Sequence, residues 1–133
     1  MKKVVFGAVI SIIIFFVGHY IVADIFNKHT RINAGDVQSI TINAITFEAE
    51  SNPKEIAEFL QIYNKAKVSN KIGDTTPAYG IEIKLKNGKK VDIQGTTQGF
   101  HYVNDGEKSY IISSAEMTYY LKDIVKQKMI TEN

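Results

Sequence analysis

Residues 79–95 read YGIEIKLKNGKKVDIQG, and this stretch decides the fold of the chain. Apolar and polar residues alternate on both sides of Asn87-Gly88, a dipeptide that tight two-residue hairpin turns prefer. Alternation with a period of two places one face of each strand in a core and the other toward water. The stretch therefore predicts an antiparallel hairpin with one apolar and one polar face.

The flanking sequence predicts further strands and two helices. Residues 37–47, 100–103 and 110–112 are rich in β-branched and aromatic residues and predict one strand each, whereas residues 69–77 contain turn formers without a period. Residues 52–55 (NPKE) and 113–116 (SSAE) are typical helix starts. Apolar residues follow both starts at helical spacing: Ile56, Phe59, Leu60 and Tyr63, then Met117, Tyr120, Leu121 and Ile124.

This order of elements, β-α-β-β-β-β-α, predicts the α+β class. Strands joined by short turns form an antiparallel sheet, here of about five strands, and both helices should cover the same face. The other face of the sheet is then expected to be open.

The first part of the chain is different in kind. Residues 4–26 contain one charged residue, Asp24, and as a helix they would span ~34 Å, enough to cross a bilayer. We expect residues 1–3 to be a cytoplasmic start, 4–26 a transmembrane signal-anchor helix, 27–35 a linker, and 36–133 a single folded domain. A cleaved signal peptide is the main alternative, but Ile21, two positions before Ala23, fits a cleavage site poorly.

Charge and layout together predict a location and a class of partner. Lys2 and Lys3 precede the apolar run and a folded domain follows it, so we expect a single-pass protein of the cell membrane with its domain outside the cytoplasm. Residues 30–133 contain thirteen Lys and Arg and thirteen Asp and Glu. A neutral domain disfavours nucleic acid as a partner and leaves a protein or component of the envelope as the expected one.

Three groups of residues are candidate contact sites. Tyr79, Tyr102 and Tyr110 come from three strands and, if they share a face with His101, form a binding patch; core packing is the alternative. Asp74, Thr75 and Thr76 lie in the expected loop, where ordinary turn chemistry also explains them. Lys84, Lys86, Lys89 and Lys90 surround the hairpin turn and either contact lipid or wall polymer or simply keep the hairpin soluble.

The sequence does not predict an enzyme, a metal site or a cofactor. His101 alternates with Phe100 and Tyr102, so we expect it on the face opposite these aromatics and partly exposed. It has no assignable nucleophile or paired carboxylate, and a chain without cysteine offers no spacing of metal ligands. The expected function is a binding or interaction module. The alternatives are a small hydrolase-like envelope enzyme with a site near His101, and an accessory subunit acting through its transmembrane helix.

The arrangement of elements resembles one repeat of the TATA-binding-protein-like fold, a curved antiparallel sheet with helices on one side. The layout of a Lys-Lys start, apolar helix, short linker and small sheet domain is also similar to membrane-anchored envelope proteins of Gram-positive bacteria that have no assigned function. This resemblance implies a small β-α-β4-α domain outside the cytoplasm. It implies no site residues, because fold likeness does not carry function.

Overall fold

The computed structural model describes residues 28–70 and 76–132. The predicted cytoplasmic start and transmembrane helix, and the candidate loop residues Asp74 and Thr75, lie outside these residues. Within the described ranges, no helix combines the length and hydrophobicity needed to cross a membrane.

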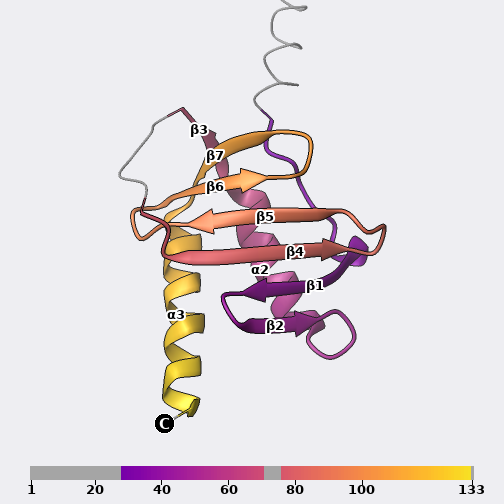
Figure 1. Cartoon of the computed structure of the whole chain (residues 1–133), viewed down its shortest axis with the longest axis vertical. Coiled ribbons are helices and arrows are strands. Elements are labelled where there is room, and N and C mark those ends of the chain that lie inside the picture. Colours follow the sequence, from indigo (N-terminus) through magenta and orange to yellow (C-terminus); the bar gives the residue numbers. More distant parts are fainter. Residues whose placement is uncertain (1–27, 71–75, 133) are drawn as a thin grey trace, which may run out of the picture.

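One antiparallel sheet of seven strands organises the domain, in the order β2-β1-β4-β5-β6-β7-β3 (Figure 1). The strands are β1 Val37–Ile42, β2 Ile45–Glu48, β3 Lys67–Ser69, β4 Tyr79–Leu85, β5 Lys90–Gly95, β6 Phe100–Asn104 and β7 Ser109–Ser113. The predicted hairpin is confirmed: β4 pairs with β5, and Gly88 in the turn has φ +89°. The α+β class and the antiparallel sheet are therefore as expected, with two more strands.

The first extra strand arises because residues 37–47 form two strands instead of the predicted one. Asn43 adopts φ 53°, which asparagine tolerates better than most residues, and reverses the chain between β1 and β2. Its backbone N–H and side-chain Oδ1 bond to the carbonyl (2.8 Å) and N–H (2.9 Å) of Gly80 on β4. The second extra strand, β3, is only three residues long and is defined as a strand by its antiparallel pairing with β7.

Two helices, α2 Pro53–Lys65 and α3 Ala115–Glu132, lie on the same side of the sheet (Figure 1). Helix α3 begins within the predicted SSAE start, one residue later than the S-x-x-E spacing implies: Ser114 Oγ accepts from the Met117 N–H at 3.0 Å. Asn52 does not cap α2 through its side chain, which instead accepts a hydrogen bond from the Glu48 N–H. Both predicted apolar stripes face the core, where Ile56, Phe59, Leu60, Tyr63, Met117 and Leu121 are each at most 2% exposed.

The segment predicted as a linker is packed against the domain. Residues 28–33 have no regular structure and lead into a short 3-10 helix, η1, Ala34–Asp36. His29 is 8% and Ile32 6% exposed, and Ile32 belongs to the hydrophobic core. The folded unit thus extends back to Lys28.

Leu121 provides a test of this packing. Its side chain is fully buried between α3 and the sheet, so Leu121→Ala should lower the free energy of unfolding by about 2–5 kcal/mol through lost burial and a residual cavity. The matched control is Ile130→Ala in the same helix, where the side chain is 68% exposed and the expected change is within about 0.5 kcal/mol. Urea unfolding followed by circular dichroism measures both, and equal effects would contradict the packing described.

Candidate functional site

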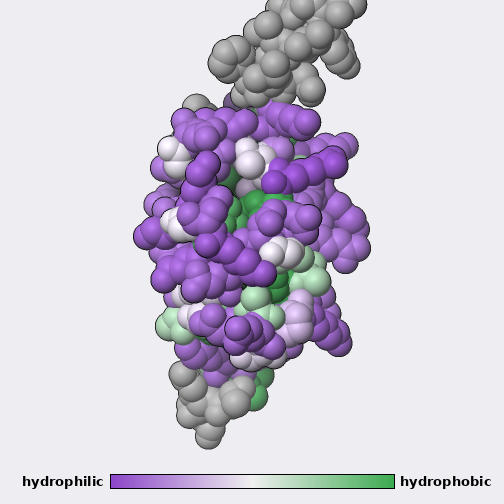
Figure 2. Space-filling model, turned by 90° about the vertical axis from the view of Figure 1, so that its right-hand side faces the viewer, coloured by the Kyte–Doolittle hydropathy of each residue, from purple (hydrophilic) through white to green (hydrophobic). Residues whose placement is uncertain are grey.

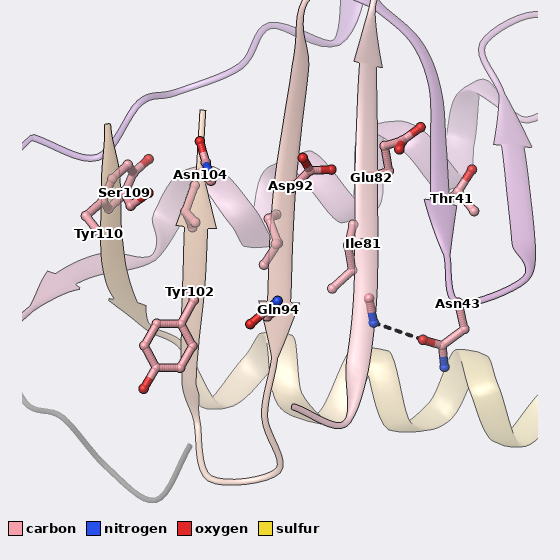
Figure 3. Close-up of a pocket in the computed structure, with 13 residues that line it drawn as sticks. Thr41, Asn43, Ile81, Glu82, Asp92, Gln94, Tyr102, Asn104, Ser109 and Tyr110 are labelled. Atoms are coloured by element: carbon pink, nitrogen blue, oxygen red, sulfur yellow. Dashed lines mark hydrogen bonds between the residues drawn. The ribbon is translucent and has the colours of Figure 1, made fainter. Parts of the chain in front are cut away.

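Neither of the two helices in the described part of the chain covers the second face of the sheet, which we call the open face from here on (Figure 1). This face is concave and polar. A hollow of about 910 Å³ lies over its central strands β1, β4, β5, β6 and β7 (Figure 3). The helices lie behind the sheet in this view, on the side away from the hollow. The polar side chains that line it are those of Thr41, Asn43, Glu82, Asp92, Gln94, Tyr102, Asn104 and Ser109.

Strand register lines up six polar residues across the sheet. Each is the direct partner of the next on the neighbouring strand, and we call them the polar row: Thr46, Thr41, Glu82, Asp92, Asn104 and Ser109. The two threonine hydroxyls at one end are 3.0 Å apart and hydrogen-bonded. The row exists because the alternation that buries Ile81, Ile83, Val91 and Ile93 turns their neighbours outward.

Two carboxylates stand opposite each other at the centre of the polar row. Glu82 on β4 faces Asp92 on β5, and like charges in directly paired positions destabilise a sheet. Glu82 is compensated by Lys84 at 3.7 Å and Lys90 at 3.9 Å. Asp92 makes no ion pair within the described part of the chain, and aspartate is a poor strand former. A residue that breaks the local rules without evident compensation is the kind expected at a functional site.

The structure separates the tyrosines that were expected to share a face. Tyr102 lies on the open face and lines the hollow (Figure 3). Tyr79 and Tyr110 pack against the core, which agrees with the alternative for these two, although Tyr110, next to Ser109, is also among the residues around the hollow. Thr76 is exposed and lies away from the hollow. No binding patch therefore combines Tyr79, Tyr102 and Tyr110.

The hairpin lysines divide between the open face and the turn. Lys84 and Lys90 lie on the open face beside Glu82, and their ion pairs with it are largely exposed to solvent. Lys86 and Lys89 are exposed around the turn, where Lys89 approaches Glu107 at 4.0 Å. Three of the four lysines thus lie within ion-pair distance of a neighbouring carboxylate.

His101 lies opposite Phe100 and Tyr102 as expected, but it is fully buried where partial exposure was predicted. Its Nε2 lies 3.1 Å from the Ser114 carbonyl and 3.2 Å from Thr118 Oγ1. A carbonyl only accepts, so Nε2 carries the proton and Nδ1 accepts from the Thr96 N–H at 3.3 Å. Burial lowers the pKa of His101, and the Ser114 bond opposes that shift only in part. The neutral ring thus links β6 to the start of α3 through hydrogen bonds.

His29 is a second buried histidine, which the sequence did not single out. Its Nε2 donates to the Tyr63 carbonyl at 2.7 Å, and its Nδ1 accepts from the Tyr110 hydroxyl at 2.8 Å. Burial lowers the pKa of His29; the Tyr63 carbonyl opposes this shift, while the nearby charges of Arg31 and Lys108 add to it. Residues 27–35, which include His29, show no periodicity, so no pattern in the sequence signalled its burial.

Asp105, in the turn between β6 and β7, holds the same region together. Burial alone would raise the pKa of its carboxyl. Hydrogen bonds from the backbone N–H groups of Lys108 and Glu107 and from the Thr30 hydroxyl outweigh burial and lower the pKa overall. This carboxylate therefore stabilises the β6–β7 turn and holds the N-terminal segment to it through hydrogen bonds.

The open face presents polar groups to the hollow. It offers carboxylate, amide and hydroxyl groups held on paired strands, with one half-buried tyrosine ring. Both described histidines are buried and committed to main-chain partners, so neither faces the hollow. Among the residues the structure describes, no three His, Asp or Glu side chains are grouped to hold a metal ion.

The buried neutral histidines predict that acid destabilises the domain. Because the folded-state pKa of each lies below 6.5, the unfolded chain binds protons that the folded chain does not once the pH falls below that value. The free energy of unfolding should fall between pH 6.5 and 5, by at most about 1.4 kcal/mol per pH unit for each histidine.

Urea unfolding at several pH values tests this, with His101→Gln expected to remove the slope contributed by its ring. Asp105→Asn is the control: hydrogen bonds hold the pKa of its carboxyl below the ordinary range, so this variant should keep the slope between pH 6.5 and 5. A slope that keeps its full size in both the His101→Gln and the His29→Gln single variants would contradict the assignment.

The resemblance to TATA-binding-protein-like domains stays a prediction. Comparison with known proteins finds no family model, curated protein or solved structure that matches the chain. The structure itself has the antiparallel sheet and two helices of an α+β domain, with seven strands.

Proposed function

We propose that this chain is a membrane-tethered binding module that recognises an envelope protein or another surface component through its open face. In this proposal residues 1–3 lie in the cytoplasm, residues 4–26 cross the membrane once, and the domain lies outside. The observation that carries the proposal is the concave polar hollow of about 910 Å³ on the sheet face that neither α2 nor α3 covers (Figure 1).

The rigidity of the open face supports recognition. The side chains of the polar row are held by six antiparallel strands, and the opposite side of those strands is a close-packed core. Groups placed in advance lose little conformational freedom on binding, so more of the interaction energy remains as affinity. A partner needs only to match a surface that already exists.

The charge of the hollow indicates the chemistry of the partner. Glu82 and Asp92 are the only charged side chains that line the hollow among the described residues. The lysines that compensate Glu82 lie beside the hollow and are not part of its lining. A partner that presents hydrogen-bond donors, including cationic groups, complements this arrangement, and Tyr102 adds contact area at low entropy cost.

The burial of His101 favours a binding module over the enzyme alternative. A general base must come within hydrogen-bond reach of its substrate, and both nitrogens of this ring are used inside the protein. We therefore propose a non-enzymatic role.

The sequence of residues 4–26 supports the tether. This run has a single charged residue, and Lys28, which the domain already contacts through Lys108, follows two residues after its end. A domain joined so closely to an apolar run would stay beside the bilayer. That position favours partners at the membrane surface over freely diffusing ones.

Photocrosslinking in intact cells tests the recognition surface. Replacing Tyr102 with the photoreactive residue p-benzoylphenylalanine is a conservative change on the open face, and we expect it to capture a discrete partner. The matched control is the same replacement at Tyr119, which is 69% exposed on α3, and it should capture none. Asp92→Asn should weaken the Tyr102 adduct about tenfold or more if Asp92 is a central contact.

Two outcomes would contradict the proposal. Capture from position 119 but not 102 would move the interaction to the helix side. Capture from 102 that Asp92→Asn leaves unchanged would remove Asp92 from the contact.

A further inference from the structure

Residues 28–30 are fastened to the turn between β6 and β7. Lys108 Nζ donates to the Lys28 carbonyl at 2.8 Å. The Thr30 hydroxyl donates to Asp105 Oδ2 at 2.7 Å, and the Thr30 N–H donates to the Tyr110 hydroxyl at 2.9 Å. Three separate groups thus fix the chain where the described domain begins.

The same segment is also fastened to the last turn of α2. His29 bonds to the Tyr63 carbonyl, and its ring packs edge-on to the Tyr63 ring with centroids 4.4 Å apart. Asn64 holds Ile32 at both main-chain groups: its Oδ1 accepts from the Ile32 N–H at 2.9 Å and its Nδ2 donates to the Ile32 carbonyl at 2.8 Å. With contacts on two elements, residues 28–32 cannot pivot without breaking buried hydrogen bonds.

The distance to the apolar run is short. That run ends at Phe26, and three residues of extended chain cover at most ~11 Å, so His29 lies within that distance of its end. His29 and Lys28 lie at the end of the domain that carries β7 and β3, while α3 ends at the opposite end (Figure 1). If the run is in a bilayer, this end of the domain is the one beside it.

The charge and polarity of this end suit a lipid headgroup layer. Lys28, Arg31 and Lys67 are exposed there and form no ion pair within the described residues, whereas Asp105 is engaged by the contacts given above. Figure 2 shows a hydrophilic surface over the part of the domain next to its N-terminal end. At physiological salt charges act over about 8 Å, so cations this close to a membrane can interact with anionic headgroups.

We propose that the domain stands on the membrane through its β7–β3 end, in contact with the headgroups of anionic phospholipids. This inference rests on the proposed tether. The strands then run along the membrane and are stacked away from it, from β3 nearest to β2 farthest, as Figure 1 displays them from top to bottom. The open face looks sideways, toward a partner held beside it at the same membrane surface.

The polar row supplies two matched positions for a test. Ser109 and Thr46 are its two ends, both exposed on the open face and five strand spacings apart, or ~24 Å. The chain has no cysteine, so Ser109→Cys and Thr46→Cys each give a single labelling site. The full chain is placed in lipid nanodiscs that contain phosphatidylserine, and energy transfer from each label to a headgroup acceptor reports its distance from the bilayer.

We expect the label at position 109 to lie nearer the headgroups than the label at 46 by most of ~24 Å. Replacing phosphatidylserine with phosphatidylcholine should lengthen the distance at 109, and Arg31→Gln with Lys67→Gln should remove this lipid dependence. Equal distances at 109 and 46 in a membrane-inserted chain would overturn the orientation, and a distance at 109 that ignores lipid charge would overturn the headgroup contact. A chain that does not enter nanodiscs and is washed from cell membranes by carbonate would instead refute the tether on which the inference rests.

Discussion

The structure depends on one constraint: both helices cover the same face of the sheet. The apolar residues of α2 and α3 meet those of the strands in a single core, and fully buried residues such as Ile40, Ile83 and Ile112 come from strands across the sheet. Because side chains alternate along a strand, a core on one side leaves the other side of every strand to solvent. The same alternation of side chains therefore produces both the core and the polar row. Loss of the core packing would also disrupt the open face.

Local patterns in the sequence predicted the parts of the fold that depend on neighbouring residues. The β4–β5 hairpin followed from Asn87-Gly88 between alternating segments, and both helices followed from their spacing of apolar residues. The division of residues 37–47 into β1 and β2 was missed because Asn43-Ala44 is a weaker turn signal, which contacts to Gly80 on β4 stabilise. Strand β3 was missed because three residues carry no detectable period.

The candidate site was less predictable because it depends on contacts between residues that are distant in the sequence. The lining of the hollow depends on the register of five strands, and no local pattern reports which residues become neighbours across them. The pairing of Glu82 with Asp92 follows from the register of the β4–β5 hairpin alone, so it could have been predicted from the sequence. The burial of His29 depends on Tyr110, which is 81 residues away, so it could not be predicted from the sequence around His29. His101 illustrates the intermediate case: alternation gave its side of the sheet, but its full burial required the position of α3.

The central claim is that the open face meets a partner outside the cytoplasm. Single-cysteine variants test it directly: Gln94→Cys on the open face and Gln61→Cys on α2 replace two exposed glutamines. Their rates of reaction with a membrane-impermeant maleimide are compared in intact cells and on the purified chain. We predict that both sites react in cells, with Gln94→Cys slower there than on the purified chain and Gln61→Cys unchanged. Equal rates at Gln94→Cys in the two settings, or no reaction at either site in intact cells, would contradict it.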